Sequence, residues 1–438
     1  MPEKKEYRAI KGTRDILPPD SALWNWFEHT AREVFETFGF RDIRTPIFEE
    51  ASLFARSIGE ETDVVSKEMY TFFDPPLNLA EMQKATTEPR DQISLRPEGT
   101  ASVVRAYIEH NMQALPGNQK LYYMGPMFRR ERPQKGRYRQ FYQIGAEVLG
   151  QSDAPAIDAE VIEMLLVFFR RVRLKNIKLQ VNSIGCKDCR GKYVELLRAE
   201  LLKVKDQLKA DSQRRIETNP LRVLDSKIPE EQSIIERLPR ISDHLCEACR
   251  AHFAALRVEL KLRGVEYEEN WRLVRGLDYY TRTTFEVTAS GLGSQNAVCG
   301  GGRYDGLVEL LGGPPTKGIG FAIGSDRAIL SIQEAGDLPD LPGLAVFIAW
   351  MGEKSYVPAL RIAKKLRDAG LAVELPPEEL KFKKSLGLAD KLGARYALII
   401  GDDEVASGTF TLKRLKDAEQ RKMIENDLLE YLESERRK

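Results

Sequence analysis

The sequence at positions 128–134 reads Phe128-Arg129-Arg130-Glu131-Arg132-Pro133-Gln134 and lies between two alternating runs. These runs, Leu121–Phe128 and Arg139–Leu149, have the period of strands, and the loop 129–137 between them is basic and contains Gly and Pro. This pattern predicts a long antiparallel hairpin with a charged tip. The first half of the chain is therefore expected to contain antiparallel strands.

Helices and shorter strands are expected around this hairpin. Apolar residues recur at helical spacing over 21–38, and Gly39 is a typical helix stop. The segment 77–91 is polar and is expected to be a loop. Further helices are expected at 101–110, 159–169 and 325–335, and further strands at 177–181, 271–274, 284–288, 297–299 and 318–324.

Two other regions differ from this part of the chain in composition and in hydrophobic pattern. Residues 185–263 are charged and mostly helical in pattern, and two cysteine pairs bracket them, which indicates an inserted module. After the Pro-rich stretch 339–342, strand and helix patterns alternate to the end of the chain. That alternation predicts a small α/β domain with a largely parallel sheet.

Composition narrows the class of protein. A chain of 438 residues predicts two to four domains, and 42% hydrophobic with 30% charged residues is typical of a globular enzyme. No apolar run approaches the ~20 residues of a membrane helix, and the first residues lack an apolar signal core, so we expect a cytoplasmic protein without membrane partners. A net charge of +1 excludes binding nucleic acid by bulk charge alone. The four histidines are scattered, which argues against a histidine-ligated catalytic metal.

Neither common phosphate-binding glycine loop is present. There is no GxxxxGK[ST], and the run Gly318–Gly324 places its third glycine one residue too late for GxGxxG. A nucleotide would then be clamped by arginines, whose planar fork suits phosphate. Three arginines, Arg129, Arg275 and Arg327, follow predicted strands, although each could also be a solvated surface residue.

Several motifs in one order carry a family resemblance. The chain resembles histidyl-tRNA synthetases over essentially its whole length, and class I motifs of the HIGH and KMSKS type are absent. Motif 3 departs slightly from the family pattern, because Ser325-Asp326 replaces the usual Leu-Glu. The matching segments are Lys11–Pro18, Pro46 of motif 1, Leu95–Thr100, residues 128–134 of motif 2, the two histidine-specific signatures Leu273–Tyr280 and Gly300–Leu307, and Gly318–Arg327 of motif 3.

The resemblance implies an α+β fold with the antiparallel-sheet catalytic core of class II synthetases, a mostly helical insertion and a C-terminal α/β anticodon-binding domain. It also implies a homodimer, with Pro46 at the interface. The expected boundaries are 1–184 and 264–336 for the two parts of the catalytic core, 185–263 for the insertion, 337–343 for a linker and 344–438 for the anticodon-binding domain.

The implied activity is ATP-dependent formation of histidyl-adenylate from L-histidine and transfer of histidine to the 3′-terminal adenosine of tRNA(His), with Mg²⁺ on the ATP phosphates. The catalytic residues would be Arg129 and Arg275 at the α-phosphate, and Glu131 and Arg327 would join them in binding ATP. The residues implied to bind histidine are Glu98, Gly99, Thr100, Arg129, Gln143, Glu147, Arg275, Tyr279, Tyr280 and Tyr304. An alternative is a synthetase-like regulatory subunit of histidine biosynthesis that does not charge tRNA.

Two further features have competing interpretations. Arg132 and Gln134 at the hairpin tip would contact the tRNA acceptor stem, or the tip is merely a solvated charged loop. Glycines 300–302 either form a tight turn or let the backbone approach a ligand closely.

The cysteine pairs also leave alternatives open. Cys186 with Cys189 and Cys246 with Cys249 have the CxxC…CxxC form of a structural zinc site, although their separation exceeds the usual ribbon spacing. Packed free thiols and redox-active or disulfide-linked pairs are the other interpretations.

Overall fold

The computed structural model describes residues 6–60, 62–73, 92–290, 296–339, 341 and 343–436. The expected loop 77–91 lies outside the described residues. The chain divides into two compact units, Met1–Leu338 and Pro339–Lys438. Within the described part, no helix combines the length and the apolar character needed to cross a membrane.

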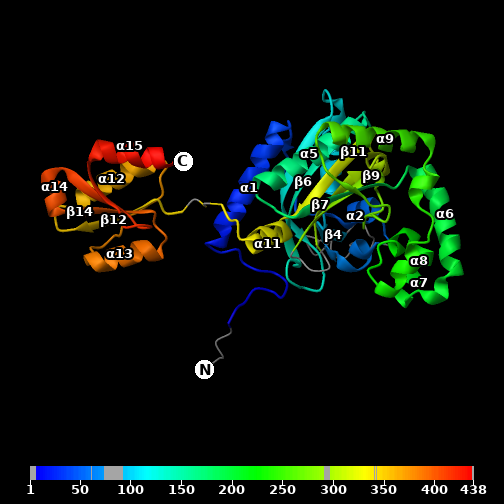
Figure 1. Ribbon diagram of the computed structural model, residues 1–438, viewed down its shortest axis with the longest axis horizontal. Helices are drawn as coiled ribbons and strands as arrows, with labels where there is room; N and C mark the ends of the chain where they lie inside the picture. The colour runs from blue at the N-terminus through cyan, green and yellow to red at the C-terminus, as the bar shows by residue number, and fades with distance from the viewer. Residues whose placement is uncertain are drawn as a thin grey trace, which may run out of the picture. The chain divides into compact units, whose positions relative to one another are not determined.

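An eight-stranded sheet forms the centre of the first unit (Figure 1). The predicted hairpin is confirmed, because β5 and β6 pair antiparallel from Gln119 opposite Leu149 to Phe128 opposite Gln140. The sheet is antiparallel except where β1 pairs with β5 and β8 with β7, so the expected antiparallel core is confirmed. In spatial order the strands are β1 (Arg41–Asp42), β5 (Gln119–Phe128), β6 (Gln140–Gly150), β11 (Lys317–Gly324), β10 (Ala297–Arg303), β9 (Thr281–Ala289), β7 (Ile177–Ser183) and β8 (Glu268–Glu269).

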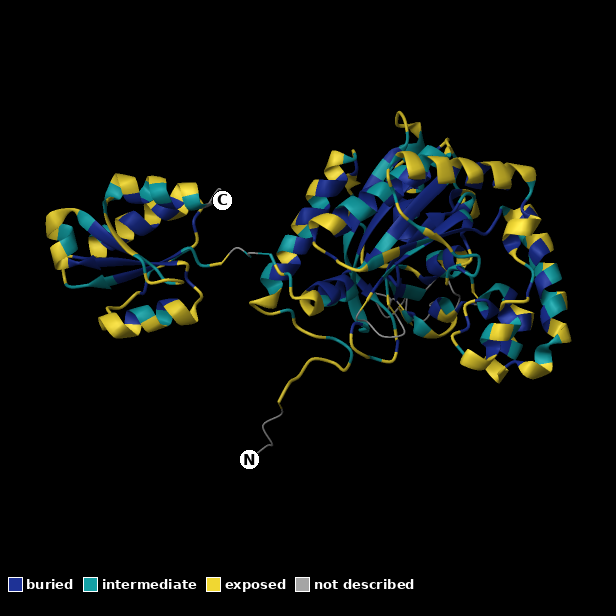
Figure 2. Ribbon diagram, in the orientation of Figure 1, coloured by how far each residue is buried: buried dark blue, intermediate teal, exposed yellow. Residues whose placement is uncertain are grey.

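Helices α1 (Asp20–Thr37) and α5 (Pro155–Arg171) cover one face of this sheet. Phe35 of α1 packs edge-on against Phe168 of α5 and against Tyr122 and Phe321 of the sheet, with ring centroids 5.7–5.8 Å apart. These aromatic rings are buried, as the dark strands and inner helix faces of Figure 2 show. This apolar layer fixes the sheet from one side and leaves the other side for the site.

Smaller elements complete the first unit. A three-stranded sheet orders its strands β2-β4-β3, and a helical region lies between β7 and β8. The bounds are β2 (Phe48–Glu50), β3 (Tyr70–Phe73), β4 (Gln92–Leu95), α2 (Ala51–Ile58), α4 (Thr100–Glu109), α6 (Lys187–Lys203), α7 (Ala210–Thr218), α8 (Pro229–Ile235), α9 (Glu247–Leu262), α10 (Leu307–Leu310) and α11 (Ser325–Ala335).

The second unit is an α/β domain with a five-stranded sheet in the order β13-β12-β14-β15-β16. Its sheet is mixed, because β15 and β16 add as an antiparallel hairpin to the parallel strands β13, β12 and β14. The prediction of a largely parallel sheet was therefore wrong for half of the pairings. The bounds are β12 (Val346–Met351), α12 (Tyr356–Asp368), β13 (Val373–Glu374), α13 (Phe382–Lys391), β14 (Tyr396–Gly401), α14 (Asp402–Ser407), β15 (Thr409–Arg414), β16 (Gln420–Ile424) and α15 (Glu425–Arg436).

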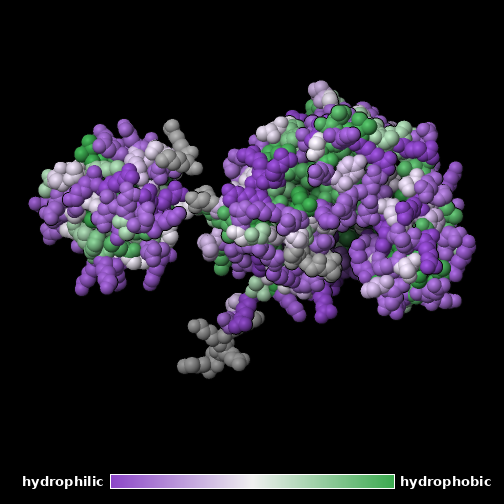
Figure 3. All heavy atoms as spheres, in the orientation of Figure 1, coloured by the Kyte–Doolittle hydropathy of each residue, from purple (hydrophilic) through white to green (hydrophobic). Residues whose placement is uncertain are grey.

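Helices pack on both faces of the second sheet. One buried cluster joins Ile348 and Leu398 to α12 and α15, and another joins Phe347 and Ala397 to α13. Adjacent residues of β12 therefore belong to opposite layers, as the period of a strand requires. The visible surface of both units is mostly hydrophilic, with hydrophobic patches between (Figure 3), as expected for a globular protein.

One predicted strand is wrong. Trp271–Val274 is a loop after β8, although three of its four residues are apolar. The carbonyls of Trp271 and Leu273 accept hydrogen bonds from Nδ2 of Asn182, at 3.2 and 3.0 Å, in place of a neighbouring strand. Arg275 therefore lies in a loop and does not directly follow a strand.

Candidate active site

A cavity of about 370 Å³ lies on the face of the sheet that points away from α1. Tyr142 of β6 packs against Trp24 of α1, whereas the next residue, Gln143, lines the cavity. Ten residues singled out in the sequence line this one cavity: Glu98, Thr100, Arg129, Glu131, Gln143, Arg275, Tyr279, Tyr280, Tyr304 and Arg327. Residues from five separate segments of the chain therefore converge at one site: 98–100, 129–143, 275–280, Tyr304 and Arg327.

Glu98 precedes α4, and its carboxylate accepts hydrogen bonds from the backbone N–H groups at the start of that helix. The donors are the N–H groups of Thr100, at 2.7 Å, and Ala101, at 2.9 Å. Burial raises the pKa of Glu98, while these donors oppose the shift. The carboxylate is thus fixed in place at the positive end of a helix.

Glu147 lies behind the cavity wall and is 1% exposed. It accepts hydrogen bonds from the hydroxyl of Thr100, at 2.8 Å, and from the hydroxyl of Tyr304, at 2.6 Å. Burial raises the pKa of Glu147 to about 8, against the opposing effect of these two hydroxyls. Glu147 therefore holds two residues that line the cavity.

Glycines make room for these side chains. A Cβ on Gly320 would lie 1.8 Å from Oε2 of Glu147, and one on Gly318 would lie 2.2 Å from the ring of Tyr304. A Cβ on Gly99 would lie 2.3 Å from the ring of Tyr123. Glycines 300–302 lie inside β10, not in a turn, and a Cβ on Gly300 would lie 1.7 Å from Nη2 of Arg275. Close packing of functional side chains on the sheet thus requires these glycines.

Arg275 reaches into the cavity from its loop. Its Nη1 donates to Oε2 of Glu286 at 2.5 Å, whereas its Nε is buried and has no hydrogen-bond partner among the described residues. Burial disfavours its charge, but Glu286, together with Tyr280 and Cys299, outweighs this effect and raises the pKa of Arg275. Glu286 was not among the predicted site residues, although a lone carboxylate within the predicted strand 284–288 was the available signal.

Tyr279 and Tyr280 form an aromatic wall beside Arg275. The rings of Tyr279 and Tyr280 are 4.7 Å apart between centroids, and Tyr279 meets Tyr304 edge-on at 5.8 Å. Gln143 faces the same cavity, and its Oε1 is buried without a hydrogen-bond partner among the described residues. This part of the cavity combines apolar rings with an unsatisfied polar atom, as a pocket for a small polar ligand would.

Two further arginines are held mainly by backbone carbonyls. Nε of Arg129 donates to the carbonyl of Pro97 at 2.9 Å, and its guanidinium lies 5.3 Å from the ring centroid of Phe141. Arg327 donates to the carbonyls of Ala297, at 3.0 Å, and Gly136, at 3.3 Å. Burial lowers the pKa of both arginines. Cations held in this way against a cavity favour an anionic ligand.

The acidic residues near these arginines are already paired. Glu131 is buried and forms ion pairs with Arg137 and, at 3.8 Å, with Arg129. Asp326 accepts hydrogen bonds from the N–H of Tyr142, at 2.9 Å, and from Arg14, at 2.8 Å. The shorter acid of motif 3 therefore links β6 to the N-terminal segment.

The structure places Arg132 and Gln134 outside the cavity. Both are exposed at the tip of the β5–β6 hairpin, where backbone hydrogen bonds join Gln134 and Arg137. The tip presents these side chains to solvent.

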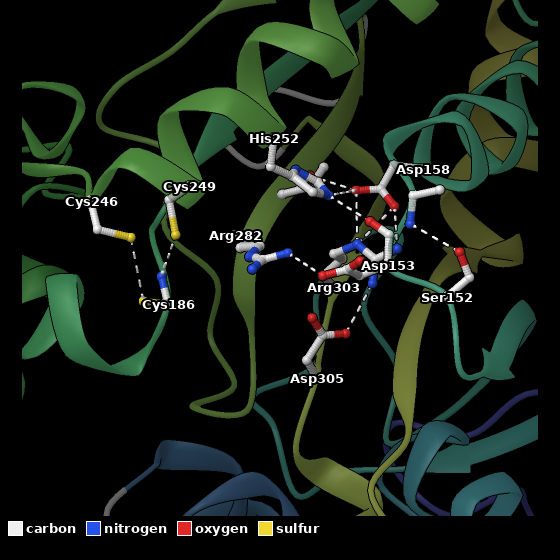
Figure 4. A network of polar contacts seen from close by, with 12 residues as sticks. Ser152, Asp153, Asp158, Cys186, Cys246, Cys249, His252, Arg282, Arg303 and Asp305 are labelled. Carbon is white, nitrogen blue, oxygen red and sulfur yellow. Dashed lines mark hydrogen bonds and ion pairs between the residues drawn. The ribbon is translucent and has the colours of Figure 1, made fainter.

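The four paired cysteines meet at the starts of two helices. Cys186 precedes α6 and Cys246 precedes α9, and Figure 4 shows these helix starts side by side. The Sγ atoms lie 3.6 Å (186–189), 3.8 Å (189–249) and 3.9 Å (186–246) apart, and all four lie within 4.8 Å of one another. A tetrahedral zinc with Zn–S bonds of ~2.3 Å has S···S edges of about 3.8 Å, so the donor set fits zinc.

The antiparallel sheet, the arginine-lined cavity without a phosphate-binding glycine loop, and the separate α/β domain together define a class II aminoacyl-tRNA synthetase. Family models described as "Histidyl-tRNA synthetase" and "Anticodon binding domain" match residues 12–328 and 345–435. The chain belongs to the histidyl-tRNA synthetase family.

Relatives and solved structures agree with this assignment. Two proteins named histidine–tRNA ligase are 53% and 51% identical to this chain, from Koribacter versatilis (97% of this chain and 96% of the relative) and from Solibacter usitatus (98% and 99%). The apo histidyl-tRNA synthetase of S. aureus is 37% identical, covers 98% of this chain and 100% of its own, and has a TM-score of 0.77.

Proposed function

We propose that the cavity is the site at which this chain activates L-histidine with ATP and from which it transfers histidine to tRNA(His). Full-length relatives at about half identity carry the name of that ligase, and the chain is an AMP- and pyrophosphate-forming ligase of this kind. The observation that carries the assignment of the site is the convergence of three arginines with Glu98, Gln143 and the tyrosines on one cavity.

Histidine occupies the end of the cavity that the tyrosines line. Glu98, Thr100 and the unpartnered Gln143 oxygen bind its α-amino group, and Gly99 lets the backbone pack beside Tyr123. Glu147 and Tyr280 recognise the imidazole, with Tyr279 and Tyr304 beside them. Glu147 acts from one layer behind the cavity wall, where it accepts hydrogen bonds from the hydroxyls of Thr100 and Tyr304 and so fixes two residues that line the pocket. An amino acid without ring nitrogens would leave these groups unpaired, which typically costs ~10⁴–10⁵ in specificity.

ATP occupies the end that the arginines line. Arg129 and Arg275 stabilise the charge on the α-phosphate as the histidine carboxylate attacks it and pyrophosphate leaves. Arg327 binds the triphosphate tail, and Glu131 contacts the adenine or a bound cation. Aminoacyl-tRNA synthetases in general use ATP with Mg²⁺, which neutralises charge on the β- and γ-phosphates.

The tRNA contacts lie outside the cavity. Arg132 and Gln134 at the exposed hairpin tip contact the acceptor stem, and the unit 344–438 reads the anticodon. Residues 1–184 and 264–336 form the catalytic core, 185–263 the insertion and 337–343 the linker. The active species is a homodimer, with Pro46 at the interface.

The four cysteines bind a structural zinc ion. Their spacing fits a tetrahedral thiolate site, and the structure records all four as free thiols. When bound, the ion joins the first turns of α6 and α9.

Amino-acid-dependent ATP–pyrophosphate exchange with each of the twenty amino acids tests the proposal. Exchange with histidine alone, lost in Arg275→Ala, is expected. No exchange with any amino acid would favour the regulatory-subunit alternative, and exchange with another amino acid would refute the pocket assigned to Glu147 and Tyr280.

A further inference from the structure

The residues that follow the tyrosine pair are held by the beginning of the helical insertion. The N–H of Ile184 donates to the carbonyl of Arg282, and the N–H of Arg282 donates to the carbonyl of Gly185, each at 2.8 Å. Arg282 has φ of 51°, a left-handed conformation that costs energy for a residue with a side chain. Such a conformation persists only where the surroundings fix it, so segment 184–185 determines how β9 begins.

Arg190 joins the cysteine cluster to the tyrosine pair itself. It follows Cys189 directly in the first turn of α6, and its Nη1 donates to the backbone carbonyl of Tyr280. The side chain is partly buried and also borders Asp278 in a small cavity beside the site. A shift of the first turn of α6 would therefore move the group that holds Tyr280.

The second helix of the cluster is anchored to the start of α5. His252 lies one turn after Cys249 on α9, and its Nε2 is 3.1 Å from the carbonyl of Asp153 and 3.7 Å from Oδ2 of Asp158. Asp158 is fully buried and pairs with Arg303 at the end of β10 (Figure 4). The helix α6 thus reaches the tyrosine pair through Arg190, and α9 reaches the end of β10 through Asp158 and Arg303.

We propose that Arg190 is a positioning residue for histidine recognition, and that the four-cysteine cluster controls the affinity of the pocket for histidine by fixing Arg190 against Tyr280. This inference rests on the proposed function, in which the pocket binds histidine and the cysteines hold zinc. Four thiolates on one ion lock the starts of α6 and α9 together. Without the ion, the start of α6 can shift, and Arg190 would carry that shift to Tyr280. A displacement of ~1 Å is already enough to impair a binding geometry.

The test compares full-length Arg190→Ala, Arg190→Lys, Cys246→Ser and the Arg190→Ala/Cys246→Ser double variant. Zinc content, the histidine Kd from calorimetry, and the KM values for histidine and ATP in pyrophosphate exchange are measured for each. Arg198→Ala is the matched control, because Arg198 on the same helix donates to the carbonyls of Ile216 and Glu217 within the insertion.

Arg190→Ala is expected to raise the histidine Kd and KM about tenfold, the effect of one charge-assisted hydrogen bond, without changing the KM for ATP or the zinc content. Arg190→Lys retains a cationic donor and most of the affinity. Cys246→Ser is expected to lower the zinc content and to raise the histidine Kd. The histidine Kd of the double variant should not exceed that of the single variant with the higher Kd, because both changes act through one contact.

Three results would overturn the inference: an unchanged histidine Kd in Arg190→Ala, an equal loss in Arg198→Ala, or multiplying effects in the double variant. A wild-type chain that holds no zinc would overturn the part played by the cluster. Wild-type exchange with histidine is measured first, so a failure of the proposed function is recognised before any variant is interpreted.

Discussion

Gly300→Ala is expected to remove most of the activation chemistry by displacing Arg275, although Gly300 itself has no side chain to contribute. The new Cβ would lie 1.7, 2.3 and 2.6 Å from Nη2, Cζ and Nη1 of Arg275. Contact at an ordinary ~3.4 Å requires the guanidinium to move by about 1.7 Å. A misplacement of ~1 Å can cost ~10² in rate, and loss of one pre-organised donor costs ~10²–10³, or about 2.7–4 kcal/mol.

Histidine-dependent ATP–pyrophosphate exchange measures this loss, and a double-mutant cycle identifies its cause. In an Arg275→Ala background, Gly300→Ala should cost almost nothing more, because the displaced group is already gone. Gly191→Ala, where the new Cβ meets nothing within 4 Å, controls for the substitution itself. Near-wild-type exchange by Gly300→Ala, or a full additional loss in the Arg275→Ala background, would refute the reasoning.

Three other predictions follow from buried charges and from the division into units. The pKa of Glu147 is raised from 4.5 to about 8, so folding takes up a proton between these values, and the contribution of this group to the free energy of unfolding falls as pH rises through that window. Glu147→Gln should remove this pH dependence of the free energy of unfolding, as measured by denaturant titrations at pH 5–9. If the free energy of unfolding of this variant varied with pH as in the wild type, the raised pKa of Glu147 would be contradicted. Asp158→Ala should lower the free energy of unfolding by about 3 kcal/mol, since it leaves the buried Arg303 with Asp305 as its remaining ion-pair partner among the described residues, whereas Asp158→Ala with Arg303→Met should lose less; equal losses would contradict the pairing. A chain ending at Leu338 should retain histidine-dependent pyrophosphate exchange and lose tRNA charging, as measured by aminoacylation; full charging would contradict the role of the second unit.

Local patterns were enough to predict the elements that carry the site. The hairpin β5–β6 follows from alternation around a basic loop, and α11 was predicted with the bounds Ser325–Ala335 that the structure has. The strand β16 was not predicted, because its sequence Gln420–Ile424 starts with three polar residues and has no alternation of apolar and polar residues. It pairs only with β15, at the edge of the second sheet, where no core burial imposes an apolar pattern.

Tertiary contacts decided what the patterns could not. The mostly apolar run Trp271–Val274 has the composition of a strand. However, the side-chain amide of Asn182 donates to the carbonyls of Trp271 and Leu273, which would accept hydrogen bonds from a neighbouring strand if the run were a strand. Glu147 was expected to line the pocket, and the structure places it one layer deeper, bound to Thr100 and Tyr304. Both outcomes depend on residues far away in the sequence, so no local window contains the signal.

The glycines show why a correct motif can still leave its physical role open. Glycines 300–302 are compatible with a tight turn or with a close approach, because a missing Cβ permits both. The structure favours the second, since β10 and β11 pair antiparallel here with Gly300 opposite Ala322 and Gly302 opposite Gly320. Gly300 leaves space that Arg275 fills, and on the neighbouring strand β11 Gly320 and Gly318 leave space for Glu147 and Tyr304. The glycine positions of β10 and β11 thus present a surface without side chains, and the proposed catalytic side chains reach this surface from other segments. Substitutions at these glycines should therefore impair catalysis by displacing the residues that lie against them.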